Sequence, residues 1–343
     1  MLRKILIPLA LFLYAALPLL PCLASDNPWT NTLYFENDLF AGTDQAYTNG
    51  VKYSLISPDL SPHAEEGQVP RRFLEYIYRI PFIRETSPNY SHKAEFSFGQ
   101  NMYTPKNIAE KKQITTDRPY AGWSYFGMAY HRKFFEAGKP SFMDTVEVQF
   151  GLVGPDSFAE ESQKFIHGLR DLQRPEGWDN QLNNEPGLVI AYERKWLFFK
   201  PDNSGFDYDA ILHAGASLGN VSTYANTGME IRWGWNISKN FGVSIIRPAG
   251  SSRLAVDKDF SSYLFAAVDG RAVALDIFLD GNNFTNSHEI DKKFFVADLA
   301  TGISLSYKGF MLTFGRIERT KEFENQPHSH AFGSVVFSFF YAF

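Results

Sequence analysis

Residues 331–343 read AFGSVVFSFFYAF, and apolar side chains recur at every second position of this stretch. In a β-strand successive side chains point to opposite faces, so this period indicates a strand with one apolar, aromatic-rich face. That face would carry Val335, Phe337, Phe339, Tyr341 and Phe343, opposite Ser334, Ser338 and Ala342. A strand of this kind needs an apolar environment on one side and tolerates a polar one on the other.

The same alternation recurs along the whole chain and predicts twelve strands. They lie near residues 30–39, 47–56, 93–103, 120–133, 144–153, 187–199, 208–219, 226–237, 262–279, 292–307, 309–319 and 331–343. An even number of long strands and 16% aromatic residues are typical of a single-chain membrane barrel. The last strand, which ends in Phe343, resembles the assembly signal of bacterial outer-membrane barrels. We therefore expect an all-β fold, a twelve-stranded antiparallel transmembrane β-barrel of the outer membrane. From periodicity alone, a soluble β-sandwich stays open.

Residues 1–24 read as a cleaved secretory signal, with Arg3 and Lys4 before an uncharged apolar run. The single cysteine, Cys22, lies in this segment, which excludes disulfides and thiolate metal sites in the mature chain. Cleavage removes two of the 33 Lys and Arg residues and none of the 38 Asp and Glu residues, so the mature net charge is near −7. That balance excludes a nucleic-acid partner.

Residues 25–343 are expected to form a single barrel domain. Connections that leave odd-numbered strands should face outward and those that leave even-numbered strands should face the periplasm. Residues 154–186 then form an extracellular loop, and residues 57–92 form a long periplasmic insert with a short helix over 71–79.

The 154–186 loop carries a predicted helix over residues 157–172, which begins after Pro155. Gln163 and His167 are four residues apart and share one face of this helix. Phe165, Ile166 and Leu169 are expected to pack it against the barrel rim. Imidazole changes its charge nearest to neutral pH, so His167 is the sharpest candidate for a general base. The alternative is a surface histidine without a catalytic role.

Three acidic side chains lie close together in the first predicted outward connection, namely Glu36, Asp38 and Asp44, beside Asn37 and Thr48. Carboxylate, amide and hydroxyl oxygens suit Ca²⁺ better than zinc. By strand alternation Glu36, Asp38 and Thr48 share one face and could converge at the rim. A solvated acidic loop is the alternative.

The second outward connection is basic, with Arg118 preceded by Lys106, Lys111 and Lys112. Guanidinium and ammonium groups pair with phosphate, so this loop fits an anionic glycolipid. Gly215-Ala216-Ser217-Leu218-Gly219 matches the G-x-S-x-G pattern of serine hydrolases, but it lies inside an alternating strand with no helix after it. We therefore interpret Ser217 as a small barrel residue.

Three stretches together resemble the outer-membrane lipid A 3′-O-deacylase family (LpxR-type). They are Glu36-Asn37-Asp38 with Tyr47-Thr48-Asn49-Gly50, Thr116-Asp117-Arg118-Pro119-Tyr120-Ala121-Gly122, and Gly154-Pro155 with Gln163, His167, Gly177-Trp178 and Gln181. The resemblance implies a twelve-stranded barrel with its active site at the outer leaflet, between the barrel wall and the loop helix. It also implies Ca²⁺-dependent hydrolysis of the 3′-linked acyloxyacyl ester of lipid A, a component of lipopolysaccharide.

The resemblance assigns roles to particular residues. His167 would be the general base, Asn37, Asp38 and Thr48 would form the metal-dependent catalytic site, and Arg118 would hold the substrate. Gln163 is a further candidate for substrate binding, and Glu36 for a third metal ligand beside Asp38 and Thr48. The family has an acidic residue shortly after the histidine, where this chain has Gln173, with Asp171 nearby. Glu185 is a candidate to replace it.

Two other classes of function stay open. One is an outer-membrane phospholipase, although the chain offers no convincing Ser–His pair. The other is a pore or a non-enzymatic barrel with a polar interior. We expect a monomer, and the sequence does not decide the acyl-chain preference.

Overall fold

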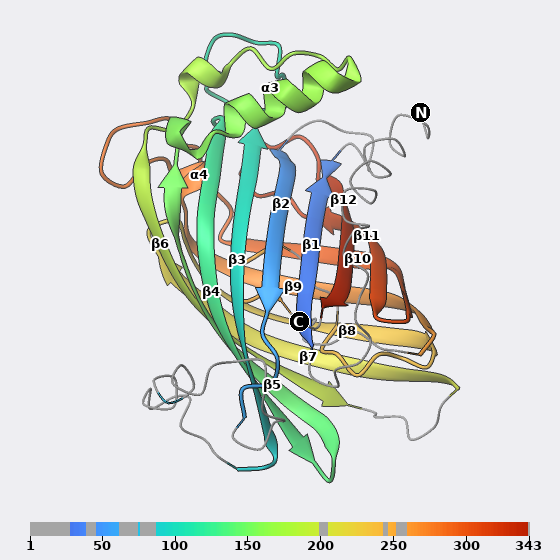
Figure 1. The fold of residues 1–343 in the computed structure, drawn as a ribbon. Helices are drawn as coiled ribbons and strands as arrows, with labels where there is room; N and C mark the ends of the chain where they lie inside the picture. The colour runs from blue at the N-terminus through green and yellow to red at the C-terminus, as the bar shows by residue number, and fades with distance from the viewer. Residues whose placement is uncertain are drawn as a thin grey trace.

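The computed structural model describes residues 28–38, 46–61, 75, 87–198, 205–242, 246–251 and 259–341. Its strands close into a single antiparallel barrel in which each strand pairs with its sequence neighbours and β1 pairs with β12 (Figure 1). The strands are β1 Trp29–Asn37, β2 Ala46–Ile56, β3 Tyr90–Thr104, β4 Ala121–Glu136, β5 Lys139–Val153, β6 Glu185–Phe198, β7 Phe206–Gly219, β8 Ser222–Trp235, β9 Ser261–Asp276, β10 Phe295–Tyr307, β11 Phe310–Arg319 and β12 His330–Tyr341. The prediction of a twelve-stranded barrel is confirmed, and the sandwich alternative is wrong.

The helices described next all lie in connections between strands. They are η2 Pro155–Ser157, α3 Ala159–Arg170, η3 Trp178–Asn180 and α4 Ile277–Asp280. The predicted strand over 262–279 ends earlier, at Asp276, whose carboxylate accepts a hydrogen bond from the Phe278 backbone N–H and caps α4. Ile277 and Leu279 therefore belong to a helical turn rather than to an alternating strand. β3 begins at Tyr90, inside the stretch that was assigned to the insert.

The wall of the barrel has an apolar outer face and a largely polar inner face. On β4, Phe126 and Met128 are exposed on the outside, whereas Trp123 and Tyr125 point inward and are buried. This arrangement is the one expected of a barrel whose outer side contacts lipid.

The connection between β8 and β9 folds back into the barrel interior. Within residues 246–251, the backbone N–H of Ile246 donates to Glu36 Oε1 at 2.8 Å, and that of Ala249 donates to Glu147 Oε2 at 2.7 Å. The buried carboxylates of the wall thus accept hydrogen bonds from the backbone of this segment, so neither the carboxylates nor the backbone N–H groups are left unpaired. The lumen is occupied on this side by the chain itself.

Some predictions fall outside the described residues. These are the signal segment, the terminal Phe343, Asp44 and most of the 57–92 insert with its helix. Among the described residues, no helix combines the length and apolar composition needed to cross a membrane.

Candidate active site

Helix α3 is seated on the outer face of the wall at one end of the barrel, which we call the α3 end (Figure 1). The helix contacts the wall at Gly122. A Cβ at this position would lie 2.3 Å from Ala159 Cβ and 2.1 Å from Ser157 Oγ, so the backbone of Gly122 is in close contact with both residues. Just before the helix, Ser157 O accepts hydrogen bonds from Gln100 Nε2 at 2.6 Å and from Ser124 Oγ at 2.7 Å. Glycine at this position therefore allows the start of α3 to touch the strands directly.

The wall-facing side of α3 is polar rather than apolar. Ala159, Gln163 and His167 recur every four residues, lie on one face and are buried, whereas Phe165 and Leu169 are exposed. The expectation that Phe165 and Leu169 pack against the rim is therefore wrong. The reason is that the helix buries the face that carries its amide and imidazole side chains.

The strands beneath α3 form a row of paired residues on the outer face. Asn37 of β1 pairs with Asn49 of β2, Asn49 with Met102 of β3, and Met102 with Gly122 of β4. Neighbouring strands are about 4.8 Å apart, so three steps from Gly122 to Asn37 span about 14 Å. The eight steps from Ala159 to His167 advance about 12 Å along the helix axis.

In Figure 1, α3 crosses the strands from the side of β4 toward that of β2. Because the start of the helix sits on Gly122, this direction and length carry His167 toward the β2 and β1 end of the row. We take the wall-facing side of α3 together with this row as the candidate active site.

His167 is oriented by the backbone. Its Nδ1 lies 2.5 Å from the carbonyl oxygen of Gln173, and since a carbonyl can only accept, Nδ1 carries the proton. The neutral ring then has its basic lone pair on Nε2. Where the family has an acidic side chain, the main chain of this protein supplies the acceptor for the imidazole.

Glu185, the candidate replacement for that acidic residue, lies elsewhere. Glu185 accepts hydrogen bonds from Asn220, Asn282 and Asn283 in the connections near β6, and Asp171 is an exposed residue at the C-terminus of α3. Glu185 is therefore held by its own group of amides and does not orient His167.

Gln163 is held by Trp178. The indole Nε1–H donates to Gln163 Oε1 at 2.7 Å, so the opposite end of the amide, Nε2, points away from Trp178. Gln163 Nε2 is buried and has no hydrogen-bond partner among the described residues. Trp178 also packs with Met102, Tyr120 and Ala159, which fixes η3 against the start of α3. The role of Trp178 is not evident from the sequence, because only the fold brings its indole next to Gln163.

Oxygen-bearing side chains gather at the ends of β1, β2 and β3. Asn37 Nδ2 donates to Thr48 O at 3.1 Å, and Thr48 Oγ1 lies 2.6 Å from Thr104 Oγ1. A β-bulge at Thr48 interrupts the register between β2 and β3. Asp38 follows directly and is fully buried. Thr104 was missed by sequence analysis, because only the pairing of β2 with β3 brings it next to Thr48.

Asn49 is a second residue without an assigned role. Its side chain lies in the row beneath α3, and its Oδ1 is buried with no hydrogen-bond partner among the described residues. A buried amide oxygen without a donor is costly, so such an atom indicates a position where a ligand or cation can be accommodated.

Glu36 lies on the opposite side of the wall. Its carboxylate faces the lumen, where it accepts hydrogen bonds from Tyr47 Oη at 3.0 Å and from the Ile246 backbone. This placement differs from the expectation that Glu36 joins Asp38 and Thr48 as a ligand. The bulge at Thr48 changes the alternation of β2, so Thr48 and Glu36 no longer share a face.

Arg118 is buried rather than outward-facing. Its Nη2 lies 2.6 Å from Glu322 Oε2, and its guanidinium lies over the rings of Tyr103 and Phe323. Burial raises the pKa of Glu322, but the charges of Arg118 and Arg319 outweigh burial and hold it at about 2. Arg118 thus ties the second connection to the last one, and its role in holding substrate stays a prediction.

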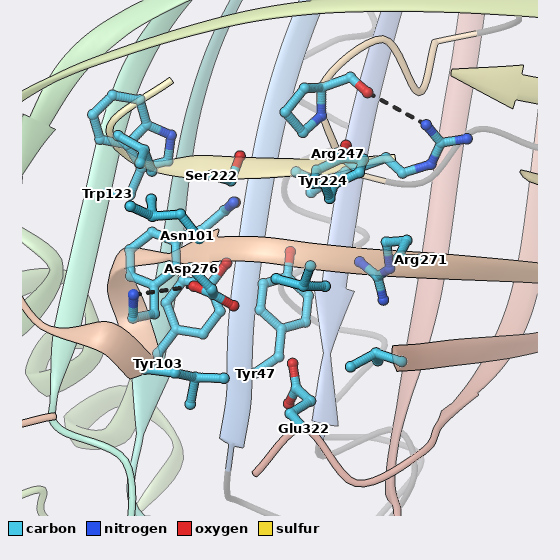
Figure 2. A pocket seen from close by; sticks show the side chains of 18 of the residues that line it. Tyr47, Asn101, Tyr103, Trp123, Ser222, Tyr224, Arg247, Arg271, Asp276 and Glu322 are labelled. Carbon is cyan, nitrogen blue, oxygen red and sulfur yellow. Dashed lines mark hydrogen bonds between the residues drawn. The ribbon is translucent and has the colours of Figure 1, made fainter. Parts of the chain in front are cut away.

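The lumen contains a cavity of about 110 Å³ on the inner side of the wall (Figure 2). Tyr47, Tyr103, Asp276, Arg271 and Glu322 line it, together with Arg247 from the connection that enters the barrel. Its lining includes neither His167 nor Gln163, so this cavity is distinct from the candidate active site. Ser217 lies within β7 and donates to Ser222 O at 3.2 Å, in agreement with its interpretation as a barrel residue.

A family model and one solved structure agree with this architecture. A family model described as outer membrane protein LpxR matches residues 8–341. The structure of LpxR from Salmonella typhimurium is similar with a TM-score of 0.70 at 16% identity, over 91% of this chain and 100% of that chain. The β domain of the Bordetella autotransporter BrkA gives a TM-score of 0.41 at 9% identity, over 92% of this chain and 99% of that chain. Comparison of the sequence with curated proteins gives no match.

Proposed function

Because the chain belongs to the LpxR family of outer membrane proteins, we propose that it hydrolyses the 3′-linked acyloxyacyl ester of lipid A. In this proposal the α3 end faces the cell exterior, where lipid A forms the outer leaflet. The observation that supports the proposal is an imidazole of defined tautomer on the wall-facing side of a helix, which crosses a row of wall residues that ends in Asn49 and Asn37.

His167 acts as the general base. Its Nε2 takes a proton from water, and the resulting hydroxide attacks the ester carbonyl carbon. The tetrahedral intermediate collapses when the C–O bond to the sugar breaks, and the imidazolium returns the proton to the leaving alkoxide. The Gln173 carbonyl, 2.5 Å from Nδ1, keeps the ring oriented during these steps. No acyl-enzyme forms, so no nucleophilic serine is needed.

Gln163 stabilises the developing oxyanion. Its Nε2–H groups are buried donors without a partner among the described residues, and Trp178 prevents the amide from turning over. Preorganised donors of this kind lower the barrier because they need no reorganisation when charge develops.

The wall residues fit a divalent cation of the calcium type. Asp38 offers a carboxylate, Asn37 and Asn49 offer amide oxygens, and Thr48 offers a hydroxyl, all of them hard donors. No group of three or more His, Cys, Asp or Glu side chains is found in the described part of the chain, which argues against a zinc-type site. When bound, Ca²⁺ supplies positive charge that polarises the ester carbonyl.

The experiment that tests the proposal is the mass of lipid A from a lipid A-producing host with and without this protein. We expect a loss equal to one acyloxyacyl group. His167→Gln should reduce the rate about 10²–10⁴-fold, the usual effect of removing a general base. His328→Gln, at an exposed histidine in the β11–β12 connection, is the matched control and should leave the rate unchanged. Unaltered lipid A with the folded wild-type protein would contradict the proposal.

Metal dependence is tested separately with the purified barrel. Chelation with EDTA should abolish activity, and Ca²⁺ should restore it. Ca²⁺ should also raise the midpoint of thermal unfolding, since a ligand that binds the native state stabilises it. This shift should disappear in Asp38→Asn, whereas full activity in chelator would exclude the metal.

A further inference from the structure

Helix α3 carries a second, apolar face that no part of the described chain covers. Phe165 and Leu169 are 67% and 70% exposed, and Phe158, just before the helix, is 65% exposed. Single exposed apolar residues are common, but three large ones on one short element form a patch that marks an interaction surface.

The helix has three faces rather than two. At about 100° per residue, Phe165, Leu169 and Ile166 fall on one arc next to the wall-facing side chains. Glu160, Glu161 and Lys164 fall on the arc opposite, and Lys164 pairs with Glu160. One arc thus contacts the wall, one is apolar and one is charged. This division is typical of a helix that lies in a membrane interface.

The apolar arc continues the lipid-facing surface of the wall. On the outer face, Phe98, Phe126 and Phe150 pair across β3, β4 and β5 and are all exposed. The next outward-facing residues of β3 and β4 toward the α3 end are Gln100 and Ser124. Both donate hydrogen bonds to the backbone oxygen of Ser157, the residue before Phe158. On β3 and β4 the apolar surface of the wall therefore ends where α3 begins.

Toward the other end of the wall lies a charged cluster on the outer face, with the aromatic side chains of Phe134, Phe142 and Trp196 just beyond it. Arg132 and Arg194 both bond Asp144, at 2.7 and 2.6 Å, and Tyr192 also donates to it. Charged groups avoid the hydrocarbon, so the cluster marks one membrane boundary.

The distance from this cluster to α3 matches the thickness of the hydrocarbon. The ten residues from Arg132 to Gly122 rise about 33 Å along β4, which is about 25 Å along the barrel axis at a usual tilt near 40°. That length equals the usual apolar band of about 25 Å, so Gly122 and the helix seated on it lie at the other boundary.

From these observations we propose that α3 is an interfacial helix whose Phe158, Phe165 and Leu169 lie among the acyl chains of the membrane leaflet. The occupant of the patch is lipid, because the patch is continuous with the lipid-facing wall and lies one membrane thickness from the charged cluster. The charged arc then faces water, and the wall-facing arc with His167 lies at the depth of the lipid ester groups. The inference concerns the membrane position of α3 and stands independently of the hydrolysis reaction.

Spin labels test this position directly. Cys22 is the only cysteine of the sequence, so Phe165→Cys, Leu169→Cys and Lys164→Cys in a Cys22→Ser background each give one label site. All three positions are exposed, so labelling leaves the fold intact. The labelled barrels are reconstituted in phosphatidylcholine vesicles, and collision rates with oxygen and with nickel–EDDA are measured.

Oxygen concentrates in hydrocarbon and the nickel complex stays in water, so the two reagents separate the faces. At 165 and 169 we expect collisions with nickel to be several-fold rarer than at 164, and collisions with oxygen to be several-fold more frequent. Equal nickel accessibility at all three positions would overturn the proposal, because α3 would then stand in water. Protection from both reagents at 165 and 169 would also overturn it, because a protein partner would cover the patch.

Discussion

Gly122 offers the sharpest test of how α3 is held on the wall. In Gly122→Ala, the new Cβ would lie 2.1 Å from Ser157 Oγ and 2.3 Å from Ala159 Cβ. Ordinary contacts between such atoms are about 3.5–4.0 Å long, so the start of α3 must shift away from β4 by more than about 1 Å. Overpacking of this kind costs about 1–3 kcal/mol locally, while the barrel strands stay paired.

The expected result is a loss of activity without a loss of fold. A displacement of about 1 Å between a base and its substrate can cost about 10²-fold in rate. We expect a decrease of that order in lipid A deacylation by Gly122→Ala, measured by mass spectrometry. The heat-modifiable migration of the folded barrel should be retained.

The same helix provides the control. A Cβ added at Gly168 meets nothing within 4 Å, so Gly168→Ala should keep full activity and stabilise the helix by about 0.5–1 kcal/mol. Combining Gly122→Ala with Ala159→Gly removes one of the two close contacts and should restore part of the rate. A Gly122→Ala protein that deacylates at the wild-type rate would refute the reasoning that direct seating of α3 builds the site.

Three further predictions concern the supports of the site and the lumen. The pKa of Glu322 is lowered from 4.5 to about 2, so its pairing with Arg118 stabilises the folded state above pH 4.5. This stabilisation amounts to about 3 kcal/mol and should be lost as the pH falls from 4.5 toward 2. Denaturant unfolding should show this slope in the wild type and lose it in Glu322→Gln. Trp178→Phe leaves Gln163 Oε1 without its hydrogen-bond donor, which costs about 1–3 kcal/mol of interaction free energy and should reduce kcat about 5- to 150-fold. Trp196→Phe is the control and should leave kcat unchanged. Planar bilayers should show no stable conductance, because residues 246–251 occupy the lumen; open channels would contradict this placement.

The fold could be predicted from the sequence because its determinants are local. Alternation of apolar and polar residues along a strand such as 331–343 predicts which side of the wall each residue faces. The pattern is local, because it compares only residues two positions apart in the sequence. The loop helix was likewise predictable from Pro155 and the residues after it. Where the local pattern was ambiguous, as in residues 277–279, the prediction of strand over helix was wrong.

The face that each side chain presents was harder to predict. Glu36 was grouped with Asp38 and Thr48 by alternation, but one extra residue at a bulge changes the faces of everything beyond it. For α3, the apolar residues were assigned to the wall because most surface helices bury their apolar face. In a barrel the surrounding solvent is lipid, so the apolar face turns outward and the polar face with His167 turns to the wall.

The sequence by itself determined the closed sheet, the position of the loop helix and the types of side chain available for chemistry, because all three follow from short-range periodicity and residue chemistry. Only the tertiary structure decided which of those side chains meet. Arg118 pairs with Glu322, Glu36 accepts a hydrogen bond from the Ile246 backbone, and Asn37 and Gly122 belong to one row through three strand pairings. Contacts between residues so far apart in sequence depend on closure of the barrel and on its register, which no local pattern encodes.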